Sequence, residues 1–423
     1  MTLLLASFAV LLVVGLPIAL AMMGSAALVI LVEGIPLSVV AQRVVTGVQS
    51  FPLLAIPLFT LAGSLMNECG ISERLFGFTR ALVGHIRGGM AQTVIVGEVF
   101  LSGITGSSVG DCAAATRVFV PQLVKAGYGE GFAAAICSAC AVLGPIIPPS
   151  ILMVIYAWQA NISLGDLFWA GVIPGLVLAV AMMLVVGLVA ARRGYPKDAA
   201  FSLARVGREF RHAFWALMMP VLILVGFRMG VFTATEIAGV AAAYSLVVGL
   251  FIYRNLDWRR IPGILLQTAK ETGVILMIVA AASPFSWILG IEQAPQLITE
   301  AIKGATSSPW MVLLLLNVVL LVLGCFMETI AIMIILVPIL LPVLQSFGID
   351  LTHFGIVLLV NLVIGQLTPP VGVLLFVSSS ISGIRLAVIA KEVIPFVVVL
   401  IAALALLTYV PWLSLVLPVM FKS

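Results

Sequence analysis

Long apolar stretches recur from one end of this sequence to the other, and few folds can accommodate them. Most reach about twenty residues, the length that an α-helix needs to cross a hydrocarbon core of about 30 Å. Only 9% of the 423 residues are charged, against about a quarter in soluble proteins. We therefore predict an all-α, multi-spanning membrane protein. The stretches cover residues 2–32, 51–67, 90–124, 131–159, 166–191, 214–230, 236–253, 262–290, 309–346, 354–381 and 394–419.

Two of these stretches, 90–124 and 309–346, are too long for a single crossing. Each has glycine and polar residues near its middle, where the chain could turn back. Irregular backbone is tolerated at membrane depth only where protein or a water-filled cavity surrounds it. We therefore predict two re-entrant helical hairpins. The stretch 2–32 has no basic segment before it, which predicts a retained membrane segment rather than a cleaved signal peptide, and Pro17 could divide it in two.

An internal repeat relates the two halves of the chain. A shift of 221 residues, without a gap, superposes glycines and prolines of the first half on the same residues of the second: Gly103 on Gly324, Gly144 on Gly365, and Pro148-Pro149 on Pro369-Pro370. Glycine and proline together make up 38 + 22 = 60 of the 423 residues, so a chance register that matches so many of them is improbable. Each copy contains one hairpin and then one helix with a Gly-x-x-x-Pro-Pro break.

The positions of the basic residues predict how each copy is oriented, because Lys and Arg accumulate in cytoplasmic loops. Basic residues cluster at 74–87, 192–211 and 254–260, whereas the connection at 292–303 has few of them. The first hairpin is then predicted to open from the cytoplasm and the second from the outer face. Two inverted repeats are the architecture that secondary transporters use for alternating access.

The two helix breaks read Gly144-Pro145-Ile146-Ile147-Pro148-Pro149-Ser150 and Gly365-Gln366-Leu367-Thr368-Pro369-Pro370-Val371-Gly372. Consecutive prolines remove backbone donors and unwind a helix. The freed carbonyl groups cost several kcal/mol at the membrane midplane unless something coordinates them. Na⁺ fits that role because it prefers oxygen ligands. The alternative interpretation is a pair of packing kinks.

The middle of the first hairpin reads SGITGSSVGD, from Ser102 to Asp111, and is rich in hydroxyl groups and glycine. Glycine lets the backbone approach a ligand closely. Helix N-termini at such a tip present N–H groups that can bind a carboxylate. The alternative is a tightly packed interface of small residues.

Acidic residues within the hairpins are candidate functional residues, because a carboxylate at midplane is costly to keep. Asp111 and Glu328 lie at the two predicted tips, and Glu98 lies in the first arm. Arg117 is a candidate partner for one of these acids, or a counter-ion for the substrate. A structural ion pair is the alternative for Arg117.

These motifs resemble those of the large membrane subunit of tripartite ATP-independent periplasmic (TRAP) transporters. The resemblance extends over essentially the whole chain and rests on SGITGSSVGD, GPIIPPS, GQLTPPVG, VPILLPV and the basic central loop. It implies an elevator mechanism, location in the bacterial inner membrane, a separate small four-helix membrane subunit, a periplasmic substrate-binding protein, and coupling to two or more Na⁺ ions.

The resemblance also implies roles for particular residues. One Na⁺ site would use Ser102, Thr105, Gly144, Ile147 and Pro149, and a second would use Gly324, Gly365, Thr368 and Val371, mostly through carbonyl groups. Substrate handling is implied for Ser107, Ser108, Asp111 and Glu328. The implied substrate is a small organic anion such as a dicarboxylate, a keto acid or a sugar acid.

The expected organisation follows the repeat. We predict scaffold helices in 1–87, the first transport half in 88–160, further scaffold helices and the basic loop in 161–290, the second transport half in 291–383, and a C-terminal helix in 384–423. We expect membrane lipid, and no nucleic acid, around the chain.

Three other functions are alternatives, and the sequence argues against two of them. A sodium/dicarboxylate or other ion carrier acting alone would share the inverted hairpins. A channel would not explain two cation-like breaks. A membrane enzyme needs an acid pair, a Ser/His set or a motif such as HExxH, and neither the scattered histidines nor Cys137-x-x-Cys140 predicts a metal or redox site. The sequence also lacks a Walker-type nucleotide-binding loop, so we do not expect direct ATP drive.

Overall fold

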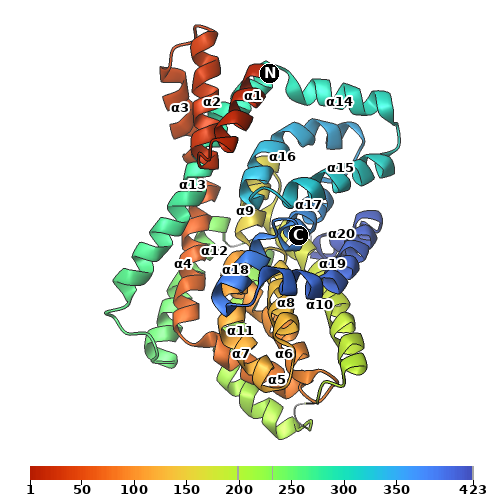
Figure 1. Cartoon of the computed structure of the whole chain (residues 1–423). Helices are drawn as coiled ribbons and strands as arrows, with labels where there is room; N and C mark the ends of the chain where they lie inside the picture. The colour runs from red at the N-terminus through yellow and green to blue at the C-terminus, as the bar shows by residue number, and fades with distance from the viewer. Residues whose placement is uncertain (198–199, 231, 422–423) are drawn as a thin grey trace.

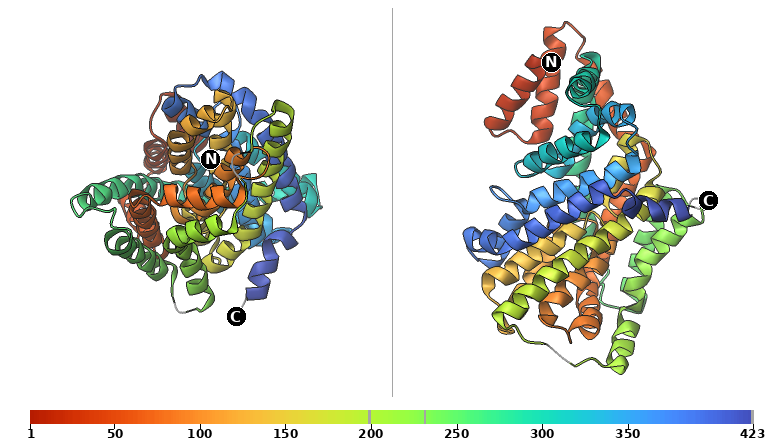
Figure 2. Two further views of the ribbon diagram at one scale, coloured as in Figure 1. Left: turned by 90° about the horizontal axis from the view of Figure 1, so that it is seen from below. Right: turned by 90° about the vertical axis from the view of Figure 1, so that its right-hand side faces the viewer.

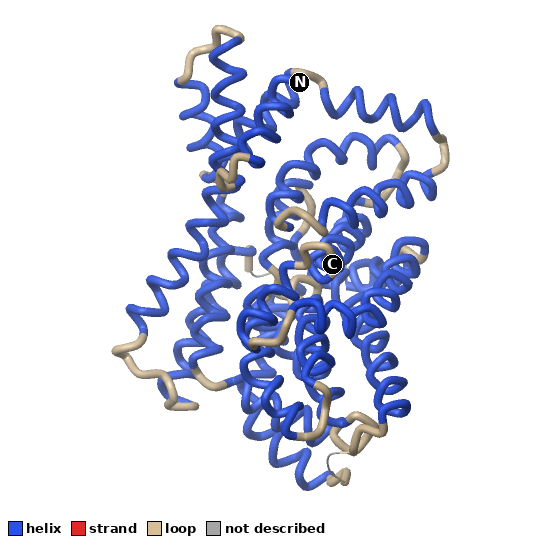
Figure 3. The backbone as a smooth tube through the Cα atoms, in the orientation of Figure 1, coloured by secondary structure: helices blue, strands red, loops and turns tan. Residues whose placement is uncertain are grey.

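The computed structural model describes residues 1–197, 200–230 and 232–421, and within these ranges the chain is helical and contains no strand (Figures 1 and 3). The first half contains α1 (Thr2–Val13), α2 (Ile18–Val32), α3 (Ser38–Val48), α4 (Ala55–Glu68), α5 (Ile71–Val83), α6 (Gly89–Thr105), α7 (Ser108–Lys125), α8 (Glu130–Cys140), α9 (Ile151–Ala160) and α10 (Leu164–Arg193). The second half contains α11 (Leu203–Arg228), α12 (Ala234–Val247), α13 (Ile261–Ile291), α14 (Ala294–Ala305), α15 (Pro309–Gly324), α16 (Thr329–Ser346), α17 (Leu351–Leu367), α18 (Val373–Ser382), α19 (Leu386–Tyr409) and α20 (Trp412–Phe421).

Seven of the described helical segments are long and apolar enough to cross a membrane, which confirms the multi-spanning prediction. They are Phe51–Glu68, Leu164–Arg193, Leu203–Arg228, Ala234–Ile252, Ile261–Ile291, Thr329–Ser346 and Leu386–Tyr409. The remaining apolar helices are shorter, and several are the separate pieces of hairpins and broken helices. The predicted stretch 2–32 is two short helices, because the chain turns between Val13 and Ile18, with Pro17 as the N-cap of α2.

Both long stretches fold as helical hairpins. In the first, α6 ends at Thr105, Gly106 takes the left-handed conformation (φ +63°), and α7 begins at Ser108. In the second, α15 ends at Gly324 and α16 begins at Thr329. The chain thus turns at the polar residues in the middle of each stretch, as the sequence predicts.

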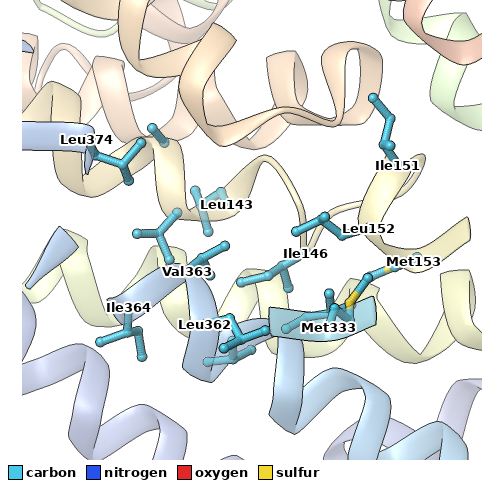
Figure 4. Packing of buried hydrophobic residues seen from close by; sticks show 14 of the residues in the cluster. Leu143, Ile146, Ile151, Leu152, Met153, Met333, Leu362, Val363, Ile364 and Leu374 are labelled. Carbon is cyan, nitrogen blue, oxygen red and sulfur yellow. The ribbon is translucent and has the colours of Figure 1, made fainter. Parts of the chain in front are cut away.

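Both Pro-Pro segments interrupt a helix. After α8, a short 3₁₀ segment (Ala141–Leu143) and an irregular stretch lead to α9, and residues 368–372 separate α17 from α18. The Pro148–Pro149 and Pro369–Pro370 peptide bonds are both cis. The first break packs in the buried core against α17, the helix that leads into the second break. Figure 4 shows Leu143 and Ile146 of the first break close to Leu362 and Val363 of α17.

Helices of the two halves begin and end at positions related by the same shift of 221 residues that relates the two halves of the sequence. Adding 221 to the bounds of α7 (108 and 125) gives 329 and 346, the bounds of α16. Adding 221 to 130, where α8 begins, gives 351, where α17 begins. The register read from glycine and proline therefore coincides with the register of the helices.

Three amphipathic helices lie outside the predicted apolar stretches. These are α3, α5 and α14, and each mixes charged or polar residues with apolar ones. In Figure 1, α3 and α14 lie near the upper end of the molecule and α5 lies near the lower end. A search for long apolar runs misses such helices, because only one of their faces is apolar.

A buried polar network ties the second half to the C-terminal helices. Asn317 of α15 donates to Thr408 of α19 (Nδ2 to Oγ1, 2.9 Å), and Asn361 of α17 donates to Asn317 Oδ1 (2.8 Å). His353, also buried, lies within hydrogen-bond distance of Ser414 Oγ of α20 (Nδ1 to Oγ, 2.7 Å). His353 lies in the first turn of α17 and is an interior residue of this network.

The basic connections gather at one end of the molecule. The end of α10, the start of α11 and the turn between α12 and α13 lie toward the bottom of Figure 1, whereas α14 lies at the top. The side view in Figure 2 also shows the end of α10 and the start of α11 at the lower end. Arg260 contacts Glu68 at the lower end (Nη1 to Oε2, 3.4 Å). This separation of charge is consistent with a cytoplasmic lower end.

The orientation predicts which connections an impermeant reagent can reach. Single cysteines replacing Ala200, in the basic connection, and Ala305, at the end of α14, both lie at exposed positions. In a cysteine-free background, we expect external thiol reagent to label Ala305→Cys in intact cells and Ala200→Cys only after permeabilisation. Equal external labelling of both variants would contradict the topology. The neighbouring position Ala199, equally suitable by sequence, lies outside the described residues.

Candidate functional site

The tip of the first hairpin packs directly against the first helix break. A Cβ added to Gly106 would lie 2.7 Å from the carbonyl oxygen of Pro149, so only glycine fits there. Ser107 caps α7, because its Oγ accepts from the N–H of Gly110 (3.3 Å). The Pro149 carbonyl therefore faces the hairpin tip.

Asp111 joins the hairpin to the break through its buried carboxyl group. Thr105 Oγ1 donates to Asp111 Oδ1. The other oxygen, Oδ2, points to the break, since a Cβ on Gly144 would lie 2.6 Å from it. Of the oxygens in this group, Asp111 Oδ2 and Ser102 Oγ are buried and have no hydrogen-bond partner among the described residues.

Glu98 adds a second buried carboxyl group beside Asp111. The two carboxyl groups lie beside each other, and a hydrogen bond between them requires one of them to carry a proton. The Glu98 oxygens have no other partner in the described part of the chain. Buried polar atoms are nearly always paired, so unpaired oxygens require a reason. A cluster of unpaired oxygens beside a broken helix can bind a cation. Ile147, in the same break, packs its side chain against Gly175 of α10.

The second hairpin meets the second break through bare backbone. A Cβ on Gly365 would lie 2.6 Å from Gly324 Cα, so the two glycines are in contact. Thr368 Oγ1 donates to the Ile364 carbonyl (2.7 Å), which leaves the lone pairs of Oγ1 free to accept or coordinate. Val371 lies in the irregular segment that leads to α18. Among the residues implied for the second cation site, Gly324 and Gly365 are thus brought together.

Glu328 has a different environment from Asp111. It is half-buried and caps α16, because its Oε2 accepts from the N–H of Ala331 (3.0 Å). In the 221-residue register Glu328 corresponds to Ser107, the cap of α7, since 107 + 221 = 328. The two tip acids, expected at equivalent places, therefore occupy different places in their hairpins.

Arg117 does not lie among the buried acids. It is exposed on α7 and lines a separate cavity with Lys125 and Arg385. The expectation that it pairs with a hairpin acid is wrong, because Arg117 lies more than one helical turn beyond buried Asp111 and on a different, exposed face of the helix.

A small cavity separates the two hairpin tips. Its volume is about 170 Å³. The lining includes the first tip (Ser107, Ser108), the second tip (Glu328, Thr329) and Ile275 of α13. Three of the four residues implied in substrate handling thus share one cavity, and Asp111 lies behind it.

Gln366 holds this arrangement together and was not singled out by the sequence. Its Oε1 accepts from Ser108 Oγ (2.8 Å), and its Nε2 donates to Thr329 Oγ1 (2.7 Å). One buried side chain from the second break thus bridges the two hairpin tips. The only sequence signal was its place inside the Gly-x-x-x-Pro-Pro break.

An all-helical membrane chain whose hairpin tips and broken helices meet at one cavity with both polar and apolar walls has the architecture of a membrane transporter. Residues 5–413 match the family described as Tripartite ATP-independent periplasmic transporter, DctM component. The chain therefore belongs to the family of TRAP large permeases. It is a multi-pass inner-membrane transporter subunit and not an enzyme.

Similar proteins agree with this family. The C4-dicarboxylate TRAP transporter large permease protein of Pseudomonas aeruginosa is 41% identical over 88% of this chain and 87% of that one. The sialic acid TRAP transporter large permease protein of Vibrio cholerae is 37% identical over 97% and 96%. The crystal structure of the Alcanivorax borkumensis YdaH transporter shares the fold, with a TM-score of 0.63 at 15% identity over 89% of this chain and 88% of that chain.

The bridge made by Gln366 gives a testable prediction. Gln366→Met keeps the length of the side chain but removes both hydrogen bonds, leaving two buried hydroxyl groups unpaired at a cost of about 1–3 kcal/mol each. We expect the variant to insert normally and to lose most transport, because the tips are no longer held in register.

The matched control is Gln92→Met. Gln92 is buried in α6 and donates to the Met183 carbonyl of α10 (2.9 Å), away from the tips. If both variants transport equally well relative to their amounts in the membrane, Gln366 has no special role at the cavity.

Proposed function

We propose that this chain is the membrane-spanning core of a Na⁺-coupled uptake system for a small organic anion. In this proposal a periplasmic binding protein delivers the anion, and a small four-helix membrane subunit completes the complex. The observation that carries the proposal is the convergence of both hairpin tips and the second break on one 170 Å³ cavity, bridged by the side chain of Gln366.

The chemistry of the cavity supports an anionic substrate. The N-terminal residues of α7 and α16 both line the cavity, and helix N-termini attract negatively charged groups. The hydroxyl groups of Ser107 and Ser108 can donate to carboxylate oxygens. The related permeases named for C4-dicarboxylate and sialic acid carry acids, so a carboxylate is the class of substrate that we propose.

Sodium coupling is proposed from the unpaired oxygens. In the first half, Ser102 Oγ and Asp111 Oδ2 are buried without partners near the Pro149 carbonyl. In the second half, Gly324 and Gly365 expose backbone at a helix break. Transported Na⁺ bound at both places would balance the charge of the substrate and join each hairpin to its broken helix.

An elevator motion of two inverted repeats fits the same features. Within the hairpins and broken helices, α7 packs against α8 and α18, α16 packs against α9, and α15 packs against α17. The bounds of these helices repeat after 221 residues. The moving group is predicted to be residues 88–160 and 291–383. In the proposed mechanism it moves against the remaining helices while the cavity stays closed around the bound anion. Ile275 of α13 covers one side of the cavity, so it would be left behind as the group moves.

Reconstitution tests the proposal directly. The complex in liposomes, with the cognate binding protein outside, should accumulate the anion only when Na⁺ is higher outside, and should not need ATP. Uptake that is independent of the binding protein would support the stand-alone carrier instead. Uptake without Na⁺ would remove the cation proposal and leave the family assignment intact.

The tip acids are expected to matter for transport rather than for folding. Asp111→Asn keeps an acceptor for Thr105 and removes the charge, and Glu328→Gln keeps an acceptor for the N–H of Ala331. Both variants should reconstitute in normal amounts and lose most uptake with the binding protein present. Near-normal uptake by either would reduce that acid to a hydrogen-bond acceptor, and loss of folded protein would identify a stabilising network.

Thr368 should tune the response to Na⁺. Thr368→Val keeps the shape and removes the one side-chain oxygen among the proposed ligands of the second site. We expect the Na⁺ concentration for half-maximal uptake to rise about tenfold, equivalent to about 1.4 kcal/mol.

Thr60→Val is the matched control for Thr368→Val, because Thr60 makes the same helical hydroxyl-to-carbonyl bond (to Ile56, 2.8 Å) in α4. An unchanged Na⁺ dependence in Thr368→Val would place the second cation elsewhere.

A further inference from the structure

A second polar cavity, of about 860 Å³, lies between the last turns of α7 and the connection from α18 to α19. Three basic residues line it, Arg117 and Lys125 from α7 and Arg385 from the connection, against one acidic residue, Glu130. All four are exposed. The walls therefore present an excess of positive charge to whatever enters.

This positive charge is not neutralised by the protein. Among the described residues, no ion pair involves Arg117, Lys125 or Arg385, although Arg193 nearby pairs with Glu392 (Nη2 to Oε2, 2.8 Å). A cavity lined by one sign of charge raises the local concentration of ions of the opposite sign. Guanidinium groups also bind oxyanions through paired N–H donors. The side chains thus suit an oxyanion.

The position of the cavity relates it to the tip cavity. Ser108 and Val109, at the start of α7, line the tip cavity, and Arg117 is nine residues beyond Ser108 along the same helix. At 1.5 Å per residue the separation is about 14 Å. Gly110 and Arg117 are both exposed and seven residues apart, so they share one face of α7. Val109, which lines the tip cavity, is also exposed and adjoins Gly110, so this exposed face of α7 begins beside the tip cavity and reaches the basic cavity.

The basic cavity also lies at the end of the molecule that carries the basic connections. The bond between Arg193, at the end of α10, and Glu392, in the second turn of α19, brings the start of α19 to that end. By the distribution of positive charge this is the cytoplasmic end. An anion that leaves the tip cavity toward the cytoplasm along α7 would meet the basic cavity next.

We propose that the cavity lined by Arg117, Lys125 and Arg385 is a second anion site, a cytoplasmic vestibule that draws the transported organic anion out of the tip cavity. This inference rests on the proposed function, since it supplies the exit for the same substrate. It gives Arg117 a role as a counter-ion after release rather than at the tip.

The headgroup of an anionic phospholipid has the same chemistry as a small oxyanion and is the other possible source of charge. Apolar residues such as Val120, Ile384 and Val388 also line the cavity, and basic pockets at the cytoplasmic side of membrane helices bind such headgroups. The experiment therefore includes an arm that separates a soluble anion from a lipid.

The test measures the charge of the cavity with probes of known sign. Ser382 lines the cavity, and Ser382→Cys, in a cysteine-free full chain in nanodiscs of phosphatidylcholine, can react with methanethiosulfonate reagents that carry either a sulfonate or a trimethylammonium group. We expect the sulfonate reagent to react faster, and the ratio of the two rates to fall about tenfold or more when Arg117→Gln and Arg385→Gln are added. Arg259→Gln, an exposed arginine outside this cavity, should leave the ratio unchanged.

Competition identifies the source of the anion. Inorganic phosphate and succinate should slow the sulfonate reagent, and adding phosphatidylglycerol to the nanodiscs should not. Protection by phosphatidylglycerol would overturn the vestibule in favour of a lipid site, and equal rates for both reagents would overturn any anion site. None of these readouts needs transport, so they can fail while Na⁺-driven uptake succeeds.

Transport provides the second readout. In liposomes in which the unsubstituted complex takes up its anion, Arg117→Gln should slow uptake several-fold and Arg117→Lys should restore most of it, because the charge returns. Equal uptake by Arg117→Gln, Arg259→Gln and the unsubstituted complex would remove the vestibule from the transport path.

Discussion

A backbone that leaves its helix inside the membrane must find partners within the protein. This chain leaves its helices at two Pro-Pro breaks and two hairpin tips. These four irregular segments lie close together, so they provide partners for one another. The first tip lies against the Pro149 carbonyl, the second tip lies against Gly365, and Gln366 bridges both tips. The surrounding helices pack around this centre, where Leu143 and Val363 belong to the buried core. The polar centre is therefore where irregular backbone is sheltered, and it is also where a polar cargo could be bound.

Much of this centre could be predicted from the sequence, because glycine and proline mark irregular backbone locally. The turns of both hairpins, the two breaks and the 221-residue register each depend on nearby residues. The contacts of Gln366 could not be predicted, since its partners Ser108 and Thr329 are 258 and 37 residues away and one of them belongs to the other half. The direction of Arg117 was missed for a related reason: only the packing of α7 against α8 and α18 decides which of its faces is exposed. Amphipathic α3, α5 and α14 lack the long apolar runs that identify spanning helices.

The two halves share a backbone plan but differ in chemistry. Ser107 and Glu328 occupy the same register position and both cap the second helix of a hairpin. Asp111, by contrast, corresponds to Ile332 of the second half, since 111 + 221 = 332. Only the first half therefore has a carboxylate from its hairpin facing its helix break. In the second half, the groups at the break that could bind a cation are mainly backbone carbonyls. A pair of proposed cation sites built on one plan can differ in this way, because a buried charge favours a cation more strongly than carbonyl dipoles alone.

The contact between Gly324 and Gly365 has a thermodynamic consequence. With no side chain between them, the second hairpin and its broken helix meet as two bare backbones. Any separation of the hairpin from the helix would pull apart carbonyl groups that a cation between them would need. Cation binding and closure of the hairpin would then be coupled. A bound cation would raise the equilibrium constant for closure, and closure would raise the affinity for the cation by the same factor. Such reciprocity would let the ion gradient decide when this hairpin is shut, without any residue dedicated to sensing it.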